Sequence, residues 1–89
     1  MAKKRRKLNK DFEKKIYTSK KNVELVLAKI YDIDDEDIQK EYMSAFNGVV
    51  YTYNELKEDY EQKGFSDHSE ELLTNYKNAF NLFESEFEI

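Results

Sequence analysis

The sequence contains no cysteine, no proline and no tryptophan, and its two glycines, Gly48 and Gly64, stand far apart. Without cysteine the chain forms no disulfide, Cys-ligated zinc site, iron–sulfur cluster or thiol nucleophile. Two isolated glycines exclude a glycine-rich phosphate-binding loop. The longest uninterrupted apolar run covers residues 25–28, whereas a membrane-spanning helix needs roughly 20 apolar residues. We therefore expect a soluble, cytoplasmic protein that makes no membrane contact.

Aromatic and charged residues are abundant. The 89 residues include seven Tyr and six Phe, and 38% of the chain is charged. Large apolar side chains offset the entropy that is lost when the chain becomes ordered, so this composition favours a folded protein over a disordered one. At this length the chain has room for a single hydrophobic core.

The net charge of −4 conceals a division between two parts of the chain. Residues 3–21 hold ten Lys/Arg against two Asp/Glu, a net charge of +8. Residues 22–89 hold five Lys against seventeen Asp/Glu, a net charge of −12. Such an asymmetry is typical of a basic arm attached to an acidic body. We expect residues 1–10 to form the arm and residues 11–89 to form a single acidic helical domain.

The C-terminal segment has the clearest helical periodicity. Its apolar side chains recur at intervals of three and four residues and predict a helix over residues 68–87. Asp67 and Glu70 have the spacing of a capping box at its start. The apolar stripe consists of Leu72, Leu73, Tyr76, Ala79, Phe80, Phe83 and Phe87.

Two shorter helices are expected before it, over residues 35–46 and 53–63. Each is preceded by a side chain that can cap a helix and followed by a glycine that can end one. The capping residues are Asp34 or Asp35 for the first helix and Thr52 with Glu55 for the second, and the glycines are Gly48, after Asn47, and Gly64. A break at Asn47-Gly48 would thus separate the two helices.

The first part of the chain allows two interpretations. Phe12, Ile16 and the apolar residues that follow predict one long helix from about residue 8 to residue 30. Alternation over residues 23–27 also fits a strand, paired with residues 49–51 in a short two-stranded sheet. The Leu and Ala residues favour the helix. The expected fold is an all-α bundle of about four helices with a basic N-terminal arm, and an α+β fold is the alternative.

No group of residues indicates catalysis or metal binding. The acidic stretch 32–37 lacks the glycine and glutamate that a calcium-binding loop requires at its sixth and twelfth positions. His68, the only histidine, has serine and aspartate neighbours, but consecutive residues at a helix start point in different directions and do not form a catalytic triad. We expect a protein that is not an enzyme and has no cofactor and no metal.

The tyrosines predict a protein-binding surface. Seven hydroxyl groups exceed what a core of this size can hold and satisfy, so we expect several tyrosines to lie at the surface beside carboxylates. The residues assigned to this acidic, Tyr-rich face are Tyr42, Tyr51, Tyr53, Glu55, Glu58, Asp59 and Tyr60.

The basic residues of the N-terminal part form the second candidate surface. They could attach the chain to nucleic-acid phosphates without sequence specificity, or form a solvated terminus with no ligand. A helix-turn-helix built from residues 35–46 and 53–63 is disfavoured, because its second helix would be net negative. The residues assigned to nucleic-acid binding are Lys3, Lys4, Arg5, Arg6, Lys7, Lys10 and Lys14.

The proline-free composition, rich in Lys, Asn, Ile, Tyr and Glu, is similar to that of small proteins of phages and mobile elements from AT-rich bacteria. We expect a non-enzymatic interaction protein that binds or inhibits a nucleic-acid-handling protein of a bacterial host, for example an anti-CRISPR-type inhibitor. The acidic Tyr-rich face would contact the protein partner, and the arm would assist. The alternative is a nucleic-acid-binding accessory, regulatory or virion protein that acts mainly through the arm. The sequence does not specify the partner or the oligomeric state.

Overall fold

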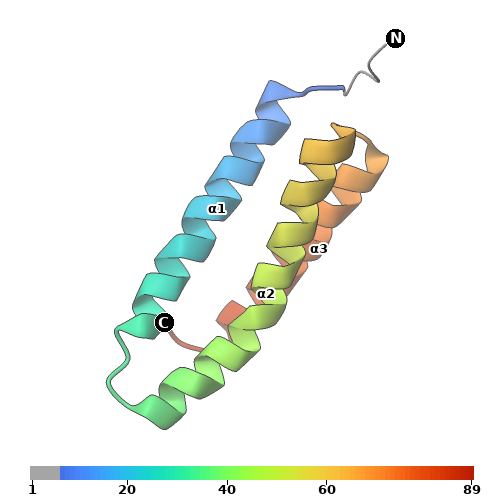
Figure 1. The fold of residues 1–89 in the computed structure, drawn as a ribbon. Coiled ribbons are helices and arrows are strands. Elements are labelled where there is room, and N and C mark those ends of the chain that lie inside the picture. Colours follow the sequence, from blue (N-terminus) through green and yellow to red (C-terminus); the bar gives the residue numbers. More distant parts are fainter. Residues whose placement is uncertain (1–6) are drawn as a thin grey trace.

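The structure, a computed structural model, describes residues 7–89 as three α-helices joined by short turns (Figure 1). The helices are α1 (Lys10–Tyr31), α2 (Glu36–Lys63) and α3 (Asp67–Glu86). No strand occurs in this part of the chain, where the one β-type contact is an isolated bridge between Lys7 and Gly64. The all-α prediction is confirmed. The predicted count of four helices is wrong, and the two-stranded sheet does not form, because residues 23–27 and 49–51 are helical.

The predicted break at Asn47-Gly48 is wrong, because α2 continues through it as one helix of 28 residues. Buried apolar residues recur on both sides of this point at intervals of three and four, which makes a single uninterrupted stripe. Gly48 lies on the exposed side of the helix, where a glycine weakens the helix by only about 1 kcal/mol. Burial of several aromatic and aliphatic side chains outweighs that loss. The stripe consists of Phe46, Val49, Tyr53, Leu56 and Tyr60.

The caps agree with the sequence prediction in part. Asp35 caps α2, where its Oδ1 accepts from the backbone N–H groups of Asp37 and Ile38 at 2.9 and 3.1 Å. The predicted capping role of Thr52 with Glu55 is wrong, because Thr52 lies inside α2 and its hydroxyl donates to the carbonyl oxygen of Val49 at 2.7 Å.

The start of α3 differs by one residue from its prediction. A capping box is present, but Ser66 and Ser69 form it in place of Asp67 and Glu70. The hydroxyl of Ser69 accepts from the backbone N–H of Ser66 at 2.7 Å, and Ser66 Oγ accepts from the N–H of Ser69 at 3.3 Å. Ser69 is buried. Gly64 ends α2 as predicted, with a positive φ of 79°.

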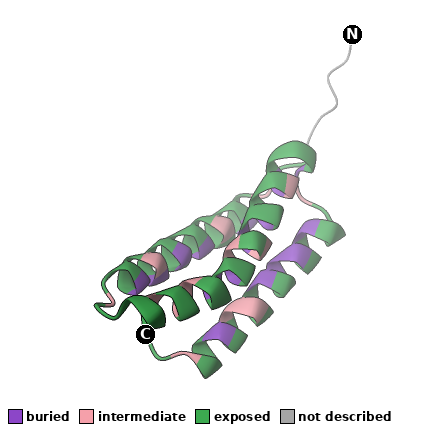
Figure 2. Ribbon diagram, turned by 60° about the horizontal axis from the view of Figure 1, so that its bottom comes forward, coloured by how far each residue is buried: buried purple, intermediate pink, exposed green. Residues whose placement is uncertain are grey.

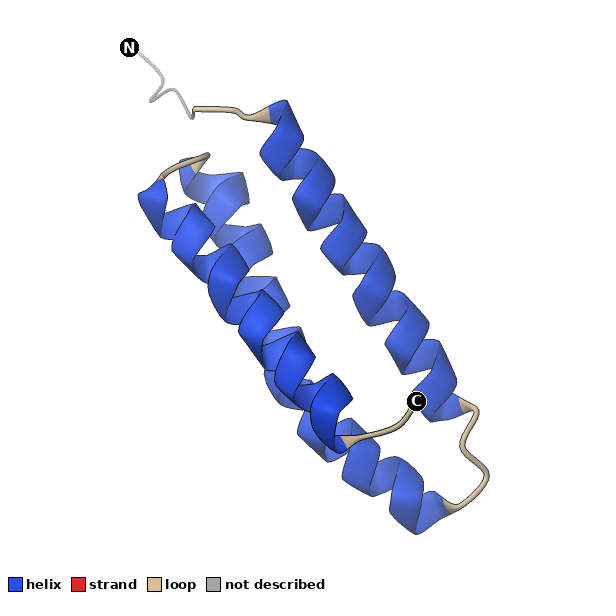
Figure 3. Cartoon of the chain, turned by 180° about the vertical axis from the view of Figure 1, so that it is seen from behind, coloured by secondary structure: helices blue, strands red, loops and turns tan. Residues whose placement is uncertain are grey.

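The three helices run antiparallel in sequence order, so α1 and α3 point in the same direction on either side of α2 (Figures 1 and 3). The turn between α2 and α3 lies beside the start of α1. At the opposite end, the C-terminal residues after α3 cross toward the end of α1. The molecule is elongated, with principal dimensions of 56 × 23 × 18 Å.

The core runs along the inner side of all three helices (Figure 2). Helix α2 is central, because both α1 and α3 pack against it and the α2–α3 contact is the more extensive one. Aromatic rings connect α2 to α3, for example Phe46 to Phe83 with ring centroids 4.8 Å apart. The buried core residues are Phe12, Val23, Val26, Ile30, Phe46, Val49, Tyr53, Leu56, Tyr60, Leu72, Leu73, Tyr76 and Phe83.

The residues just before α1 are attached to the turn between α2 and α3. The carbonyl oxygen of Lys7 accepts from the backbone N–H of Phe65 at 2.6 Å. The ammonium group of Lys7 lies 5.9 Å from the centre of the Phe65 ring. The N–H of Asn9 donates to the hydroxyl oxygen of Tyr60 at 3.0 Å. Asn9 also caps α1 by accepting from the N–H of Phe12. This attachment holds residues 7–9 against the rest of the molecule.

Candidate interaction surfaces

The structure divides the predicted Tyr-rich face into core and surface residues. Tyr53 and Tyr60 are buried on the inner side of α2, and Tyr42 is half-buried. Tyr53 and Tyr60, each 7% exposed, therefore offer a partner little surface. Tyr51, Glu55 and Glu58 remain exposed.

These three exposed residues form one stripe. Tyr51, Glu55 and Glu58 follow each other at intervals of four and three residues, which places them on the side of α2 that faces away from the core. The Tyr51 ring is 64% exposed. We refer to these three residues as the outer face of α2. It offers an amphipathic ring beside two carboxylates, a combination that suits a basic protein surface.

Asp59 belongs to the junction between α2 and α3. Its side chain is 8% exposed, and its Oδ1 lies 3.6 Å from Lys63 Nζ and 4.0 Å from His68 Nε2. Its Oδ2 is buried and accepts no hydrogen bond in the structure. His68 also lies 3.7 Å from a carboxylate oxygen of Glu71. His68 therefore pairs with carboxylates here, and Ser66 and Ser69, its nearest serines, are engaged in the helix cap.

Two buried tyrosines have perturbed hydroxyl groups. Burial raises the pKa of Tyr53 above its ordinary value of 10.0, and the charges of Glu24 and Glu61 raise it further. Burial is also the largest cause that raises the pKa of Tyr76. The Tyr76 hydroxyl donates to the carbonyl oxygen of Ser19 at 3.3 Å, a bond that favours the protonated phenol and joins α3 to α1. Both tyrosines are neutral structural residues at physiological pH.

The predicted nucleic-acid-binding residues lie partly outside the described residues. Lys3, Lys4, Arg5 and Arg6 fall in that undescribed part. Lys7, Lys10 and Lys14 are exposed. Lys10 and Lys14 lie on the side of α1 opposite the buried Phe12, as the periodicity predicts, and Lys21 continues the same side.

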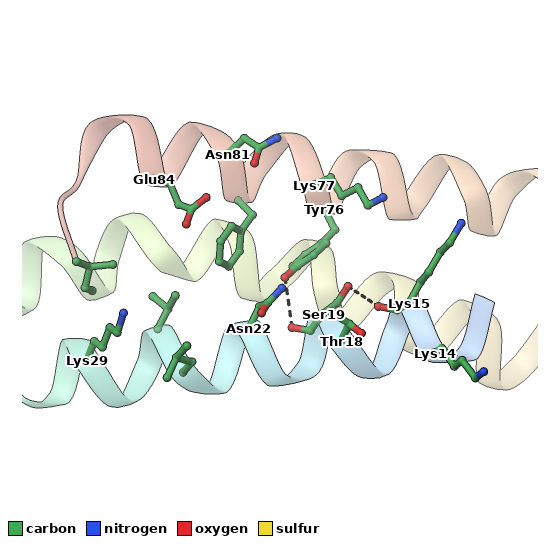
Figure 4. A pocket seen from close by; sticks show the side chains of 14 residues that line it. Lys14, Lys15, Thr18, Ser19, Asn22, Lys29, Tyr76, Lys77, Asn81 and Glu84 are labelled. Atoms are coloured by element: carbon green, nitrogen blue, oxygen red, sulfur yellow. Dashed lines mark hydrogen bonds between the residues drawn. The ribbon is translucent and has the colours of Figure 1, made fainter. Parts of the chain in front are cut away.

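A groove that the sequence did not predict lies between α1 and α3 (Figure 4). Its volume is about 620 Å³. Tyr76 lies at its floor (Figure 4), and Val26 and Ile89 also belong to its lining. The walls are Lys14, Lys15, Thr18, Asn22, Leu25 and Lys29 from α1, and Lys77, Phe80, Asn81 and Glu84 from α3.

The groove lining is basic although the molecule is acidic. It contains four lysines and one acidic side chain, that of Glu84. Leu25, on the α1 wall, is 57% exposed. The sequence signal for this exposure is the position of Leu25, which falls outside the helical face that Val23 and Val26 share. An anionic ligand with some apolar surface would fit such a lining.

Comparison of the chain with protein-family models, curated proteins and solved structures found no match. Within residues 7–89, no helix has the length and apolar character needed to cross a membrane. The same part of the chain contains no cluster of three or more side chains that could hold a metal ion. The exposed surfaces of α1 and α2 and the groove are therefore the features from which a function can be argued.

Proposed function

We propose that this chain is a non-enzymatic interaction protein that binds, and thereby inhibits, a nucleic-acid-handling protein of a bacterial host cytoplasm. The outer face of α2 contacts a basic surface of the partner. The lysines of α1 and of the N-terminal segment contact the nucleic acid that the partner carries. An origin in a phage or mobile element, and an anti-CRISPR type of inhibition, fit this proposal.

The observation that supports it most directly is that two exposed faces of one small body carry opposite charge. Tyr51, Glu55 and Glu58 are exposed on α2, and Lys10 and Lys21 are exposed on α1. A protein that handles nucleic acid presents a basic channel and bound phosphates side by side. A ligand with one acidic and one basic face is complementary to both, and such complementarity accelerates binding and selects the partner.

The alternative function, a nucleic-acid-binding accessory protein, is favoured by the exposed lysines of α1. In that case the phosphate contacts supply the affinity, and binding falls steeply with salt. Deleting residues 1–10 would not test it cleanly, because the deletion also removes the Asn9 cap and the contact of Lys7 with Phe65. Charge reversal at exposed lysines leaves these contacts in place.

The test combines capture with charge-reversal variants. The tagged chain is incubated with bacterial lysate at low and high salt, with and without nuclease, and bound proteins are identified by mass spectrometry. The variants are Glu55→Lys/Glu58→Lys on α2 and Lys10→Glu/Lys21→Glu on α1. Glu24→Lys/Glu86→Lys is a control with the same change in charge as the α2 variant, at exposed positions outside α2.

We expect one protein, bound in stoichiometric amount, that survives nuclease and is lost with the α2 variant but retained by its control. Purification of that partner then allows its activity to be measured with and without the chain. If bound material disappears with nuclease and with the α1 variant, while the α2 variant has no effect, the accessory-protein function replaces the proposed one.

A further inference from the structure

We infer that the groove between α1 and α3 is a docking site for an acidic amphipathic helix of a partner protein. The groove lies apart from the outer face of α2, so the inference does not depend on the protein contact of the proposed function. Lys14 is the one groove residue that was also assigned to nucleic-acid binding. Three observations support the inference: the charge of the groove lining, its exposed aliphatic residues and the arrangement of its two walls.

The charge of the groove differs from that of its surroundings. Residues 7–89 contain eleven lysines and nineteen Asp/Glu, a net charge of −8. The groove lining carries four of these lysines and one of these acids, a net charge of +3. The remaining described residues therefore carry −11. A concave surface with low-dielectric walls concentrates its own field, so the groove attracts an anionic ligand while the rest of the body repels it.

The accessible apolar residues in the groove are aliphatic. Leu25 on the α1 wall is 57% exposed, and Ile89, another lining residue, is 39% exposed. Phe80 on the α3 wall is half-buried. An amphipathic helix binds such a groove with apolar residues at positions i, i+3, i+4 and i+7. Acidic residues on both sides of that stripe would meet Lys15 and Lys77, which stand on opposite walls (Figure 4).

The walls have the form that a helix requires. On α1 the lining residues Lys15, Thr18, Asn22, Leu25 and Lys29 recur at intervals of three and four. They make a straight wall about 21 Å long at about 1.5 Å per residue. Helices α1 and α3 point in the same direction on either side of α2. A helix laid between them would occupy the fourth position of a four-helix bundle.

A single-stranded nucleic acid fits the groove less well. Such ligands stack their bases on exposed aromatic rings. The Tyr76 ring at the floor is only 3% exposed, and its hydroxyl is bonded to Ser19. Phe80, the other aromatic residue of the lining, is half-buried. The exposed rings of Tyr17, Tyr31 and Tyr51 lie outside the groove. Charge and aliphatic contacts together therefore favour a protein helix.

A second copy of this chain is also a poorer occupant. The outer face of α2 is acidic, but among its residues Tyr51, Glu55 and Glu58 only the tyrosine has apolar surface to place against Leu25 and Ile89. The basic N-terminal residues 3–6 would be repelled by the lysines of the groove. The occupant is thus expected to come from another protein.

The test uses the full chain and a synthetic probe. The probe is a fluorescein-labelled helical peptide of about 16 residues, with leucine at positions i, i+3, i+4 and i+7 and glutamate on both sides of that stripe. A second peptide carries lysine in place of each glutamate, and a single-stranded oligothymidylate is the nucleic-acid probe. Binding is followed by fluorescence anisotropy at several salt concentrations.

Two double variants locate the binding. Lys15→Glu/Lys77→Glu reverses one charge on each wall, and Lys40→Glu/Lys57→Glu makes the same change in charge at exposed positions of α2 outside the groove. Circular dichroism establishes that each variant is folded. A second readout needs no substitution: the side-chain amide signals of Asn22 and Asn81, one on each wall, are followed by NMR during titration with the peptide.

We expect the acidic peptide to bind with a dissociation constant that rises with salt, and the groove variant to weaken binding at least tenfold. The control variant should change binding less than twofold, and the signals of both asparagines should shift. The inference is overturned if the two variants weaken binding equally or if the asparagine signals stay unchanged. It is also overturned if only the oligothymidylate binds, or if the chain forms a dimer that the groove variant dissociates.

Discussion

Tyr60 is the residue that joins the start of α1 to the end of α2. Its hydroxyl oxygen accepts from the N–H of Asn9 at 3.0 Å and donates to Glu13 Oε2 at 2.6 Å. Its ring is buried against Phe12, with centroids 5.6 Å apart. One phenol thus satisfies a backbone donor just before α1 and a carboxylate in the first turn, in addition to filling the core. A tyrosine that looked like a surface contact in the sequence is therefore a structural residue.

We predict that Tyr60→Phe lowers the free energy of unfolding by about 1–2 kcal/mol, because the ring still fills its site but two hydrogen-bond partners lose theirs. Urea denaturation measures the change. In the Glu13→Ala background the same substitution should lower the free energy less, since one of the two bonds is already absent. Equal effects in both backgrounds would show that the bond between Tyr60 and Glu13 contributes nothing.

Tyr53 and Tyr76 make stability depend on pH in the alkaline range. The pKa of each hydroxyl is raised by burial above 10.0, its ordinary value. Above that pH the unfolded chain releases these protons while the folded chain retains them. The contribution of these two groups to the free energy of unfolding is therefore constant below pH 10 and falls as the pH rises beyond it. Urea denaturation at pH 8, 10.5 and 11 should show the decrease. The Tyr53→Phe variant should show a smaller one, and an identical pH dependence would contradict the assignment.

At the scale of elements, the two glycines have opposite roles. Gly48 lies in the middle of α2, and a Cβ added there would meet no atom within 4 Å. Gly64 ends the same helix with φ of 79° and ψ of −164°, a region that essentially only glycine adopts. The sequence assigned both glycines to helix ends, and the structure places only one there.

We predict that Gly48→Ala raises the free energy of unfolding by about 0.5–1 kcal/mol, because alanine loses less conformational freedom in a helix. Gly64→Ala should lower it by about 1–3 kcal/mol, because the side chain opposes the required backbone conformation. Thermal and urea denaturation of the two variants provide the measurement. Destabilisation by Gly48→Ala would mean that α2 is interrupted there in solution.

The bounds of a helix could be predicted from the sequence where its apolar periodicity alone determines them. Periodicity alone located α1 and α3 to within about two residues, since their stripes contain no ambiguous breaker. For α2, the local signal of Asn47-Gly48 outweighed the stripe of Phe46, Val49 and Tyr53 that crosses it. Local propensity decides a helix end only where tertiary burial does not oppose it, and here burial does.

A candidate surface could be predicted from the sequence only where all its residues lie on one helix. Once α2 is continuous, its repeat separates the exposed Tyr51 from the buried Tyr53 and Tyr60 without further information. The groove could not be predicted in this way, because Lys15 and Lys77 are brought to opposite walls only by the packing of α1 and α3 on α2. The exposure of Leu25, by contrast, follows from its position on α1 away from Val23 and Val26.

At the scale of the whole molecule, the three helices are not equally attached. Aromatic pairs such as Phe46–Phe83 and Tyr53–Tyr76 join α2 to α3 along their length. Helix α1 packs mainly against α2, and the groove separates its other side from α3. The hydrogen bond from the Tyr76 hydroxyl to the Ser19 carbonyl crosses at the floor of that groove. Helix α1 should therefore open more easily than the α2–α3 pair.

Native-state hydrogen exchange measures this difference, since each amide reports the free energy of the smallest opening that exposes it. We predict lower protection for residues 23–27 in α1 than for residues 46–56 in α2 and 73–76 in α3. Equal protection in all three helices would mean that the bundle unfolds as one unit. A ligand held between α1 and α3 binds only while both walls are in place, so it raises the free energy of opening α1 by mass action. The acidic peptide should therefore increase protection in α1 more than in the α2–α3 pair, because the peptide completes the side of α1 that the free protein leaves open.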